Sequence, residues 1–310
     1  MKYCPITYNE IQENEVYSKK GLHLLSPRLT HLEALDLSAA ELREEASIQA
    51  DKLSIQGVQP KLSANLKIKE ERFELVDKQG HYILKPQHEY YPELPENEAI
   101  SMSLASTLGI EVPVHGLVYA KDKSMTYFIK RFDRIKNDKL AVEDFAQLSQ
   151  ESRDTKYNSS MEKVIKILFE FCSFPKVEAK QFFKRCLFNF LIGNEDMHLK
   201  NFSLITLDNK VVLAPAYDFL NTTIVIKNPT EELALPLHGK KNNLKKKDFL
   251  NYLAIELLKL DEKSVQSIMR DISEHLALWE KLIERSFLSK NLQEKYLKIL
   301  AERSQRLLLP

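Results

Sequence analysis

An acid and an amide, Asp196 and Asn201, stand five positions apart in the stretch "GNEDMHLKN" at residues 193–201. A carboxylate at such a site accepts the proton of an attacking hydroxyl group, and an amide oxygen is a hard ligand that suits Mg²⁺. The loop follows the apolar run "FNFLI", which is typical of a packed helix. We therefore expect phosphoryl transfer, with Asp196 as the catalytic base and Asn201 as a metal ligand.

Phosphoryl transfer also requires a second metal ligand and a cation for the phosphates of ATP. Asp218, in "APAYDFL", lies 17 positions after Asn201 and is the candidate ligand. Lys85 closes the stretch "YILKP" and is the candidate cation, with Glu98 favoured over Glu96 as its partner on the following helix. The order of lysine, glutamate, acid, amide and second acid is that of protein kinases, which also share the spacing of the acid and the amide.

The segment that should cover the phosphates lacks the G-x-G-x-x-G pattern that a kinase ordinarily places before its lysine. In its place stands "SIQGVQPKLS" at residues 54–63, with a single glycine. Backbone N–H groups of such a loop, together with a lysine, hold phosphate oxygens, and two side chains between the acid and the amide are also within reach of a phosphate. The residues expected to contact ATP in these two segments are Gln56, Gly57, Val58, Gln59, Lys61, His198 and Lys200.

Strand signals dominate the first part of the chain. Strands are expected within 61–85, which contains two turns, and at 112–120 and 125–134. A packed helix is expected at 95–109, and a second helix at 38–53 opens with a capping box from Ser38 to Glu41.

Helical spacing dominates after about residue 138. Helices are expected at 160–172, 177–193, 248–260 and 264–288, with short strands at 202–207 and 210–220. The chain has seven glycines and no flexible linker, which argues against separate domains on a string. We predict an α+β, two-lobed protein-kinase-like fold, with an N-lobe at 1–135, a helical C-lobe at 136–310 and a short hinge at 132–137.

The composition indicates a globular protein without a strong overall charge. The 310 residues are 44% hydrophobic, and 45 Lys plus Arg against 44 Asp plus Glu leave a net charge of +1. Such a balance gives no general attraction to nucleic acid or to an anionic membrane. Cys4, Cys172 and Cys186 form no disulfide framework or zinc spacing, and the sequence has no signal-peptide or membrane-spanning pattern, so we expect a cytoplasmic protein.

Each of these residues has a simpler interpretation when it is taken alone. A single Asp or Asn at a helix end is more often a cap or a turn residue, and a lysine at the end of a strand is more often solvated. The lysine-rich stretch at 239–249, "GKKNNLKKKDF", is compatible with a phosphate backbone or tRNA, but a solvated loop before a helix explains it more simply. Order and spacing of the whole set favour the enzyme.

Taken together, the motifs resemble those of the HipA-like serine/threonine kinases, which are toxins of bacterial toxin–antitoxin modules. The stretches that carry the resemblance are "SIQGVQPKL", "YILKP", "PENE", "IKRFDR", "GNEDMHLKNFSLI" and "YDF". It runs from about Cys4 to the last helices. Longer HipA members begin with a further small subdomain, and a start at "CPITY" resembles the short HipT branch of HipBST systems, in which that subdomain is a separate HipS-like protein.

The resemblance implies the same roles for the residues named above and adds two sites. Lys130 and Phe132, in "KRF", fall where family members contact adenine through the hinge backbone, and long members have glutamate at the position of Lys130. Ser54 matches a serine whose autophosphorylation regulates the family. A phosphate there adds about two negative charges beside the ATP phosphates and disfavours nucleotide binding. Without the resemblance, a helix-end cap is the preferred interpretation of Ser54.

The resemblance also implies partners. The family phosphorylates aminoacyl-tRNA synthetases, of the glutamyl type for HipA and the tryptophanyl type for HipT, which halts tRNA charging and arrests growth. Its members bind a DNA-binding antitoxin, so contact with DNA is expected mainly through that partner. Two other functions remain open on sequence grounds: a small-molecule phosphotransferase, and a catalytically inactive nucleotide-binding scaffold.

Overall fold

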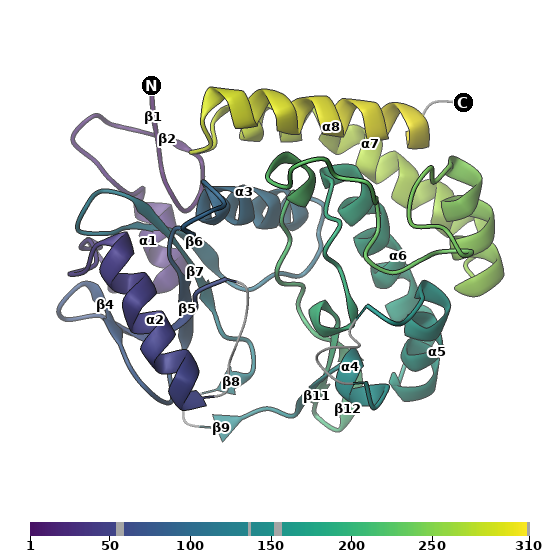
Figure 1. The fold of residues 1–310 in the computed structure, drawn as a ribbon, viewed down its shortest axis with the longest axis horizontal. Helices are drawn as coiled ribbons and strands as arrows, with labels where there is room; N and C mark the ends of the chain where they lie inside the picture. The colour runs from purple at the N-terminus through teal and green to yellow at the C-terminus, as the bar shows by residue number, and fades with distance from the viewer. Residues whose placement is uncertain (54–58, 136–137, 152–156, 309–310) are drawn as a thin grey trace.

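The computed structural model describes residues 1–53, 59–135, 138–151 and 157–308. A strand-rich lobe formed by the first part of the chain lies beside a mostly helical lobe formed by the rest (Figure 1). This arrangement is the α+β, two-lobed one that the sequence predicts.

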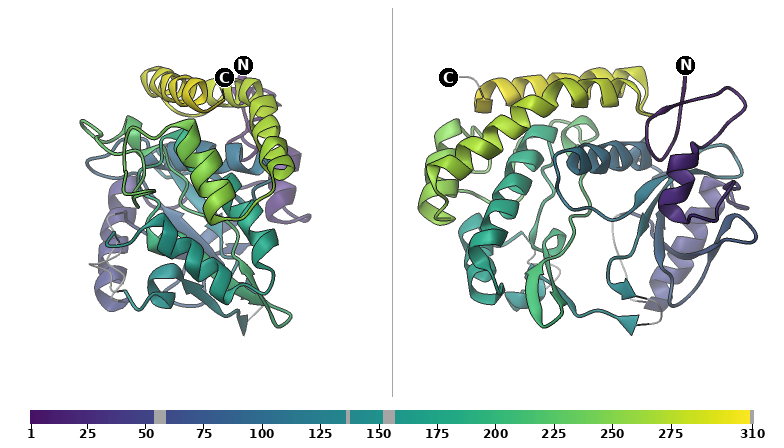
Figure 2. Two further views of the ribbon diagram at one scale, coloured as in Figure 1. Left: turned by 90° about the vertical axis from the view of Figure 1, so that its right-hand side faces the viewer. Right: turned by 180° about the vertical axis from the view of Figure 1, so that it is seen from behind.

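A five-stranded antiparallel sheet in the order β4-β3-β5-β7-β6 forms the centre of the N-lobe. Successive side chains of a strand point to opposite faces, so Phe128 of β7 packs with α1 and α2 whereas Tyr127 and Ile129 pack with α3. The sheet therefore separates α3 from the other two helices (Figure 2). The elements are β1 (Lys2–Tyr3), β2 (Glu10–Ile11), α1 (Lys19–Leu25), α2 (Ala39–Leu53), β3 (Leu62–Lys67), β4 (Arg72–Leu75), β5 (Tyr82–Lys85), α3 (Leu94–Thr107), β6 (His115–Tyr119) and β7 (Met125–Lys130).

The C-lobe packs helices around the long, largely buried α6, with a three-stranded sheet in the order β10-β11-β12 beside the N-lobe. A small hairpin, β8 with β9, joins the lobes. The elements are β8 (Arg134–Ile135), β9 (Asp138–Lys139), β10 (Val142–Asp144), α4 (Phe145–Leu148), α5 (Met161–Phe171), α6 (Pro175–Ile192), η1 (Leu199–Asn201), β11 (Ser203–Leu207), β12 (Lys210–Leu213), η2 (Thr222–Ile224), η3 (Asp248–Leu257), α7 (Glu262–Glu284) and α8 (Lys290–Leu308).

Local sequence signals explain where the helices beside the site begin and end. The capping box before α2 is present, because the Ser38 N–H donates to Glu41 Oε2 (2.7 Å) and the Glu41 N–H donates to Ser38 Oγ (3.3 Å). Helix α6 ends at Gly193, whose φ of 78° lies in the left-handed region. A Cβ atom there would lie 2.8 Å from Asn221 Oδ1, so glycine is required both by the backbone and by the packing.

Two expected elements differ most from the structure. The segment at 248–260 was expected as an ordinary amphipathic helix, but η3 is a π-helix, and at its end the Leu258 N–H donates to the carbonyl of Leu253, five residues earlier. The expected strand at 210–220 ends at Leu213, because the chain leaves the sheet before the "YDF" stretch. No helix among the described residues is both long and apolar enough to span a bilayer.

Helix α8 runs along one side of the molecule and reaches both lobes (Figure 1). Tyr296 Oη lies 2.9 Å from Ser101 Oγ of α3, in the N-lobe. Further along α8, Arg303 Nη1 donates to the carbonyl of Phe190 in α6 over 2.8 Å. The last helix therefore ties the helix that carries Glu98 to the helix that precedes the Asp196 loop.

Candidate active site

Lys85 lies at the end of β5 with its side chain almost fully buried, and two carboxylates surround it. Its Nζ atom lies 2.6 Å from Glu98 Oε1 of α3 and also contacts Asp218 Oδ1 of the C-lobe. Glu96, the other glutamate considered, accepts hydrogen bonds from Gln87 Nε2 at 2.7 and 2.8 Å instead. Glu98 is therefore the glutamate that pairs with Lys85, and the contact of Lys85 with Asp218 joins the two lobes.

Burial and their mutual charges shift the pKa values of Lys85, Glu98 and Asp218. Burial raises the pKa of Glu98 to about 7, although the charge of Lys85 opposes this rise. The low-dielectric surroundings of Asp218 would raise its pKa, but the nearby charges of Lys85 and Lys61 lower it well below its usual range. Burial would lower the pKa of Lys85, yet Asp218 and Glu98 raise it above its ordinary value. At neutral pH Lys85 and Asp218 are therefore both charged, while Glu98 titrates.

The loop that contains Asp196 is held by its own amide side chains. The Asp196 N–H donates to Asn194 Oδ1 (3.1 Å), and Asn201 Nδ2 donates to the Asp196 carbonyl (2.9 Å). His198 is buried, with Nε2 3.9 Å from Asp196 Oδ1. Because the Asn201 amino group is committed to the loop, its amide oxygen is the atom that remains suited to a cation.

Tyr217 positions Asp218 next to this loop. Its hydroxyl lies 2.5 Å from Ser203 Oγ and donates to the Lys200 carbonyl over 2.9 Å. Asp218 itself has a φ of 55°, in the left-handed region, which turns the chain at the point where its carboxylate reaches Lys85. The same tyrosine thus fixes the end of the Asp196 loop and the start of the "DFL" turn.

The donor atoms fit Mg²⁺ in chemical type. The carboxylate of Asp218 and the amide oxygen of Asn201 are hard oxygen ligands, and Mg²⁺ usually completes its shell with water and substrate phosphates. No group of three or more His, Cys, Asp or Glu side chains within the described ranges forms a metal cage. Asn201 and Asp218 would hold such an ion, with water and phosphate oxygens as its other ligands.

A cleft of about 370 Å³ lies between the lobes and reaches Lys85 and Asp218. Its apolar walls include Ile83, Ile129 and Val142, and the ring of Phe132 stacks on Tyr217 with centroids 5.7 Å apart and planes at 25°. The residues that line it are Lys61, Ile83, Lys85, Ile129, Lys130, Arg131, Phe132, Asp133, Lys139, Val142, Asp144, Gln147, Lys200, Ser203, Tyr217 and Asp218. Apolar walls with a cation at one end suit a nucleobase and its phosphates.

Two backbone N–H groups of the expected adenine-binding segment are already hydrogen-bonded within the N-lobe. The Lys130 N–H donates to the Val114 carbonyl, and the Arg131 N–H donates to the His81 carbonyl, each over 2.7 Å. A base that contacts this backbone has to use other groups of the segment, such as the N–H of Phe132. The Lys130 side chain is exposed at the edge of the cleft.

The expected phosphate loop is described only in part. Gln59 Nε2 is buried and has no hydrogen-bond partner among the described residues, and Lys61 lines the cleft. Ser54, Gln56, Gly57 and Val58 lie outside the described residues.

A model of the HipA-like C-terminal domain family matches residues 53–279 of the chain. The chain belongs to this family. It is 35% identical over 260 residues to a kinase-named protein of Haemophilus influenzae, a match that covers 78% of this chain and 75% of that protein. It is 31% identical over 191 residues to the serine/threonine-protein kinase toxin HipA of Shewanella oneidensis, covering 55% of this chain and 43% of the toxin. These relatives support a HipA-like kinase.

Solved structures confirm the fold. The HipA chain of a Shewanella oneidensis complex of HipA, HipB and operator DNA superimposes with a TM-score of 0.69 at 21% identity, over 90% of this chain and 73% of that one. The Helicobacter pylori proinflammatory kinase CtkA superimposes with a TM-score of 0.53 at 18% identity, over 73% of this chain and 87% of that one. The two-lobed kinase-like fold is therefore established.

Some residues of the candidate site were not predicted from the sequence. Tyr157 donates a hydrogen bond to Asp196 Oδ1 over 2.5 Å, but it stands in the polar stretch "DTKYNSS", where no periodicity or motif marks it. Asn97 and Asn221 exchange two hydrogen bonds of 2.9 Å between α3 and the segment after Asp218. Asn97 is part of the quoted "PENE" stretch, but only a contact that spans 124 positions shows its role.

Proposed function

We propose that the chain is an ATP- and Mg²⁺-dependent serine/threonine protein kinase and the toxin of a bacterial toxin–antitoxin system. The observation that carries the proposal is the contact of one buried lysine, Lys85, with both Glu98 and Asp218 at the end of the inter-lobe cleft. This contact brings together the lysine, the helix glutamate and the second acid, the set that protein kinases need in place for phosphoryl transfer.

Each residue then has a role in the transfer. Asp196 orients the acceptor hydroxyl and takes its proton, and Lys85, with Lys61, His198 and Lys200, meets the phosphates. The adenine base of ATP would lie between the apolar walls of the cleft and contact the hinge between Lys130 and Phe132. Asn201 and Asp218 would hold Mg²⁺, which neutralises charge on the phosphates when it is bound.

We propose the boundary between the lobes near residue 135, so that 1–135 carries Lys85 and 136–310 carries the Asp196 loop. We also propose autophosphorylation at Ser54, in the loop that would cover the phosphates together with Gln56, Gly57, Val58 and Gln59. A phosphate on Ser54 would repel the nucleotide and switch the enzyme off.

The proposed substrate is an aminoacyl-tRNA synthetase of the tryptophanyl or glutamyl type, and its phosphorylation would stop translation and arrest growth. The proposed partners are a DNA-binding antitoxin, through which the chain meets DNA, and a separate HipS-like protein, as in the HipT branch. The Shewanella structure, which contains HipB and operator DNA, supports the antitoxin.

The test is intact mass and peptide mapping after incubation with Mg²⁺ and ATP, beside Asp196→Ala with folding checked by thermal unfolding. The expected result is phosphate on Ser54 of the wild-type protein and none on Asp196→Ala, followed by transfer to a purified synthetase. Nucleotide binding without any transfer would indicate the inactive scaffold. Transfer only to a small alcohol would indicate the small-molecule phosphotransferase.

A further inference from the structure

The side chain of Tyr157 contacts the carboxylate that we assign as the catalytic base. Its hydroxyl donates to Asp196 Oδ1 over 2.5 Å, and its ring packs edge-on against His198 with centroids 5.0 Å apart and an interplanar angle of 85°. The Asp196 side chain is otherwise half exposed. Tyr157 therefore covers one oxygen of an accessible carboxylate, and it is held against the Asp196 loop itself.

The hydrogen bond from the Tyr157 hydroxyl to Asp196 resembles the one that a substrate hydroxyl would donate to a catalytic base. The hydroxyl of a substrate serine or threonine has to donate to the base at hydrogen-bond distance before its proton is transferred. Burial, the hydrogen bond to Asp196 and the charges of Asp196 and Glu231 raise the pKa of Tyr157, so the phenol keeps its proton at neutral pH and remains a donor. A substrate hydroxyl and the Tyr157 hydroxyl thus compete for the same oxygen.

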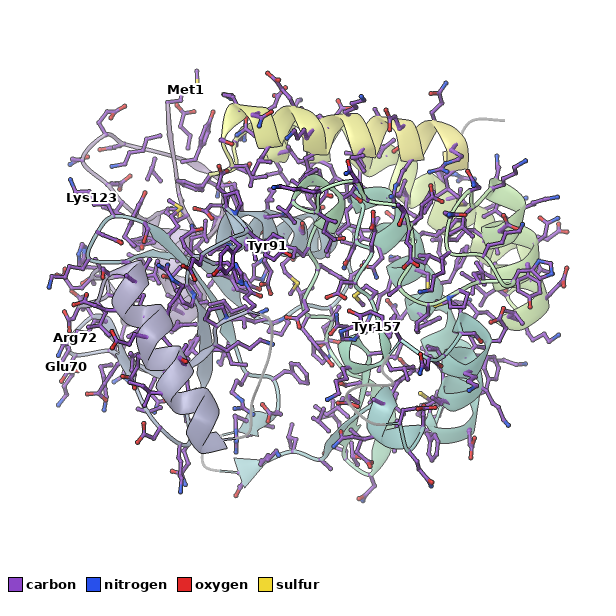
Figure 3. The ribbon with its side chains drawn as sticks, viewed as in Figure 1. Met1, Glu70, Arg72, Tyr91, Lys123 and Tyr157 are labelled. Carbon is purple, nitrogen blue, oxygen red and sulfur yellow. The ribbon has the colours of Figure 1, made fainter. Side chains whose placement is uncertain are left out.

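We propose that Tyr157 occupies the position of the acceptor hydroxyl and keeps the site self-occluded, so that a protein substrate displaces this side chain when it binds. The inference rests on the proposed function, because it assumes that Asp196 is the base. It adds a regulatory contact that lies within the helical lobe and is separate from the loop around Ser54. Tyr157 lies near the middle of the molecule in Figure 3.

Two substitutions at Tyr157 distinguish the contribution of its hydroxyl group from that of its ring. Tyr157→Phe removes the hydrogen bond and keeps the ring against His198, whereas Tyr157→Ala removes both. Tyr91→Phe is the matched control, because Tyr91 is 38% exposed, close to the 40% of Tyr157, and its ring also lies 5.0 Å from a histidine, His88. Tyr91 is in the N-lobe (Figure 3), and its ring contacts His88, which is outside the proposed machinery.

The assay measures transfer from radiolabelled ATP, with Mg²⁺, to dephosphorylated casein and to water, with Asp196→Ala as the background. Tyr157→Phe should raise the Asp196-dependent rate about tenfold, since a hydrogen bond to a charged group is typically worth at least that factor. Tyr157→Ala should act in the same direction. The KM for ATP should stay unchanged, and Tyr91→Phe should match the wild type.

Three outcomes would overturn the inference. Equal or lower turnover in Tyr157→Phe, with an active wild type, would show that the hydroxyl does not block acceptors and would leave the proposed kinase intact. Phosphate on the Tyr157 peptide of the wild type would show that this residue is an acceptor and not a block. Absence of Asp196-dependent turnover in every folded variant would remove the proposed function and the inference together.

Discussion

Replacing Glu98 with glutamine should stabilise the folded protein above neutral pH while it weakens phosphoryl transfer. Burial raises the pKa of Glu98 from its ordinary value of 4.5 to about 7, so the folded state disfavours the ionised carboxylate even though Lys85 lies 2.6 Å away. Each pKa unit corresponds to about 1.4 kcal/mol, so the difference amounts to about 3 kcal/mol.

The sign of the effect follows from the direction of this pKa shift. A group whose pKa is raised on folding contributes its full share of stability below its unfolded pKa, and the share is lost as the pH rises through the folded pKa. The wild type should therefore lose up to about 3 kcal/mol between pH 4.5 and pH 7 through Glu98, whereas Glu98→Gln should not. Urea unfolding at pH 5 and pH 8 measures the difference directly.

Glu96→Gln is the matched control for this prediction. Burial also raises the pKa of Glu96 to about 7, but its carboxylate accepts hydrogen bonds from Gln87 and does not pair with Lys85. Both variants should gain stability at pH 8, while only Glu98→Gln should lose roughly tenfold or more in kcat/KM, because only there is Lys85 less firmly positioned. The reasoning fails if Glu98→Gln is less stable than the wild type at pH 8, or if both variants lose activity equally.

Three further substitutions test the framework around the site. Gly193→Ala should lower the free energy of unfolding by about 1 to 3 kcal/mol in thermal unfolding, because φ is positive there and the new Cβ atom would lie 2.8 Å from the Asn221 side-chain oxygen. Gly239 has a similar φ but open space around it, so Gly239→Ala should destabilise the protein less in the same assay. Tyr217→Phe should lower the free energy of unfolding by about 1 to 2 kcal/mol, because it loses the hydrogen bond to the Lys200 carbonyl, and it should raise the KM for ATP; an unchanged KM would contradict the proposed positioning role. Arg303→Met should cost about 2 kcal/mol in urea unfolding because it leaves the buried Phe190 carbonyl without this donor, and a neutral result would show that α8 is not fixed there.

The elements of the fold were largely predictable because their signals are local. The strand alternation within 61–85 gave β3, β4 and β5, and the capping box at Ser38 marked the start of α2. The π-helix η3 was not predictable, because apolar spacing indicates a helix but does not distinguish hydrogen bonds to the fourth residue from those to the fifth. The small helix α4 and the hairpins at β1 and β8 are too short to carry a periodic signal.

The candidate site also contains residues that the sequence predicted and residues that it did not. Lys85, Glu98 and Asp218 were selected by order along the chain, and the structure brings their side chains together. Tyr157 was missed, because its contact with Asp196 joins residues 39 positions apart and depends on how the two lie in the folded lobe. Spacing therefore identified the charged groups, whereas the neutral side chains that hold or cover them required the fold.

Uncharged hydrogen bonds join the lobes in addition to the ion pair between Lys85 and Asp218. Lys85 and Asp218 join the lobes, but so do the two hydrogen bonds between Asn97 and Asn221, both of which are fully buried. The asparagine pair carries no charge, so neither pH nor salt weakens it as they weaken an ion pair. Helix α8 adds a further uncharged link at Tyr296. Because these contacts hold α3 against the C-lobe without Asp218, the proposed transfer of the Asp218 carboxylate from Lys85 to Mg²⁺ would leave the lobes in their relative position.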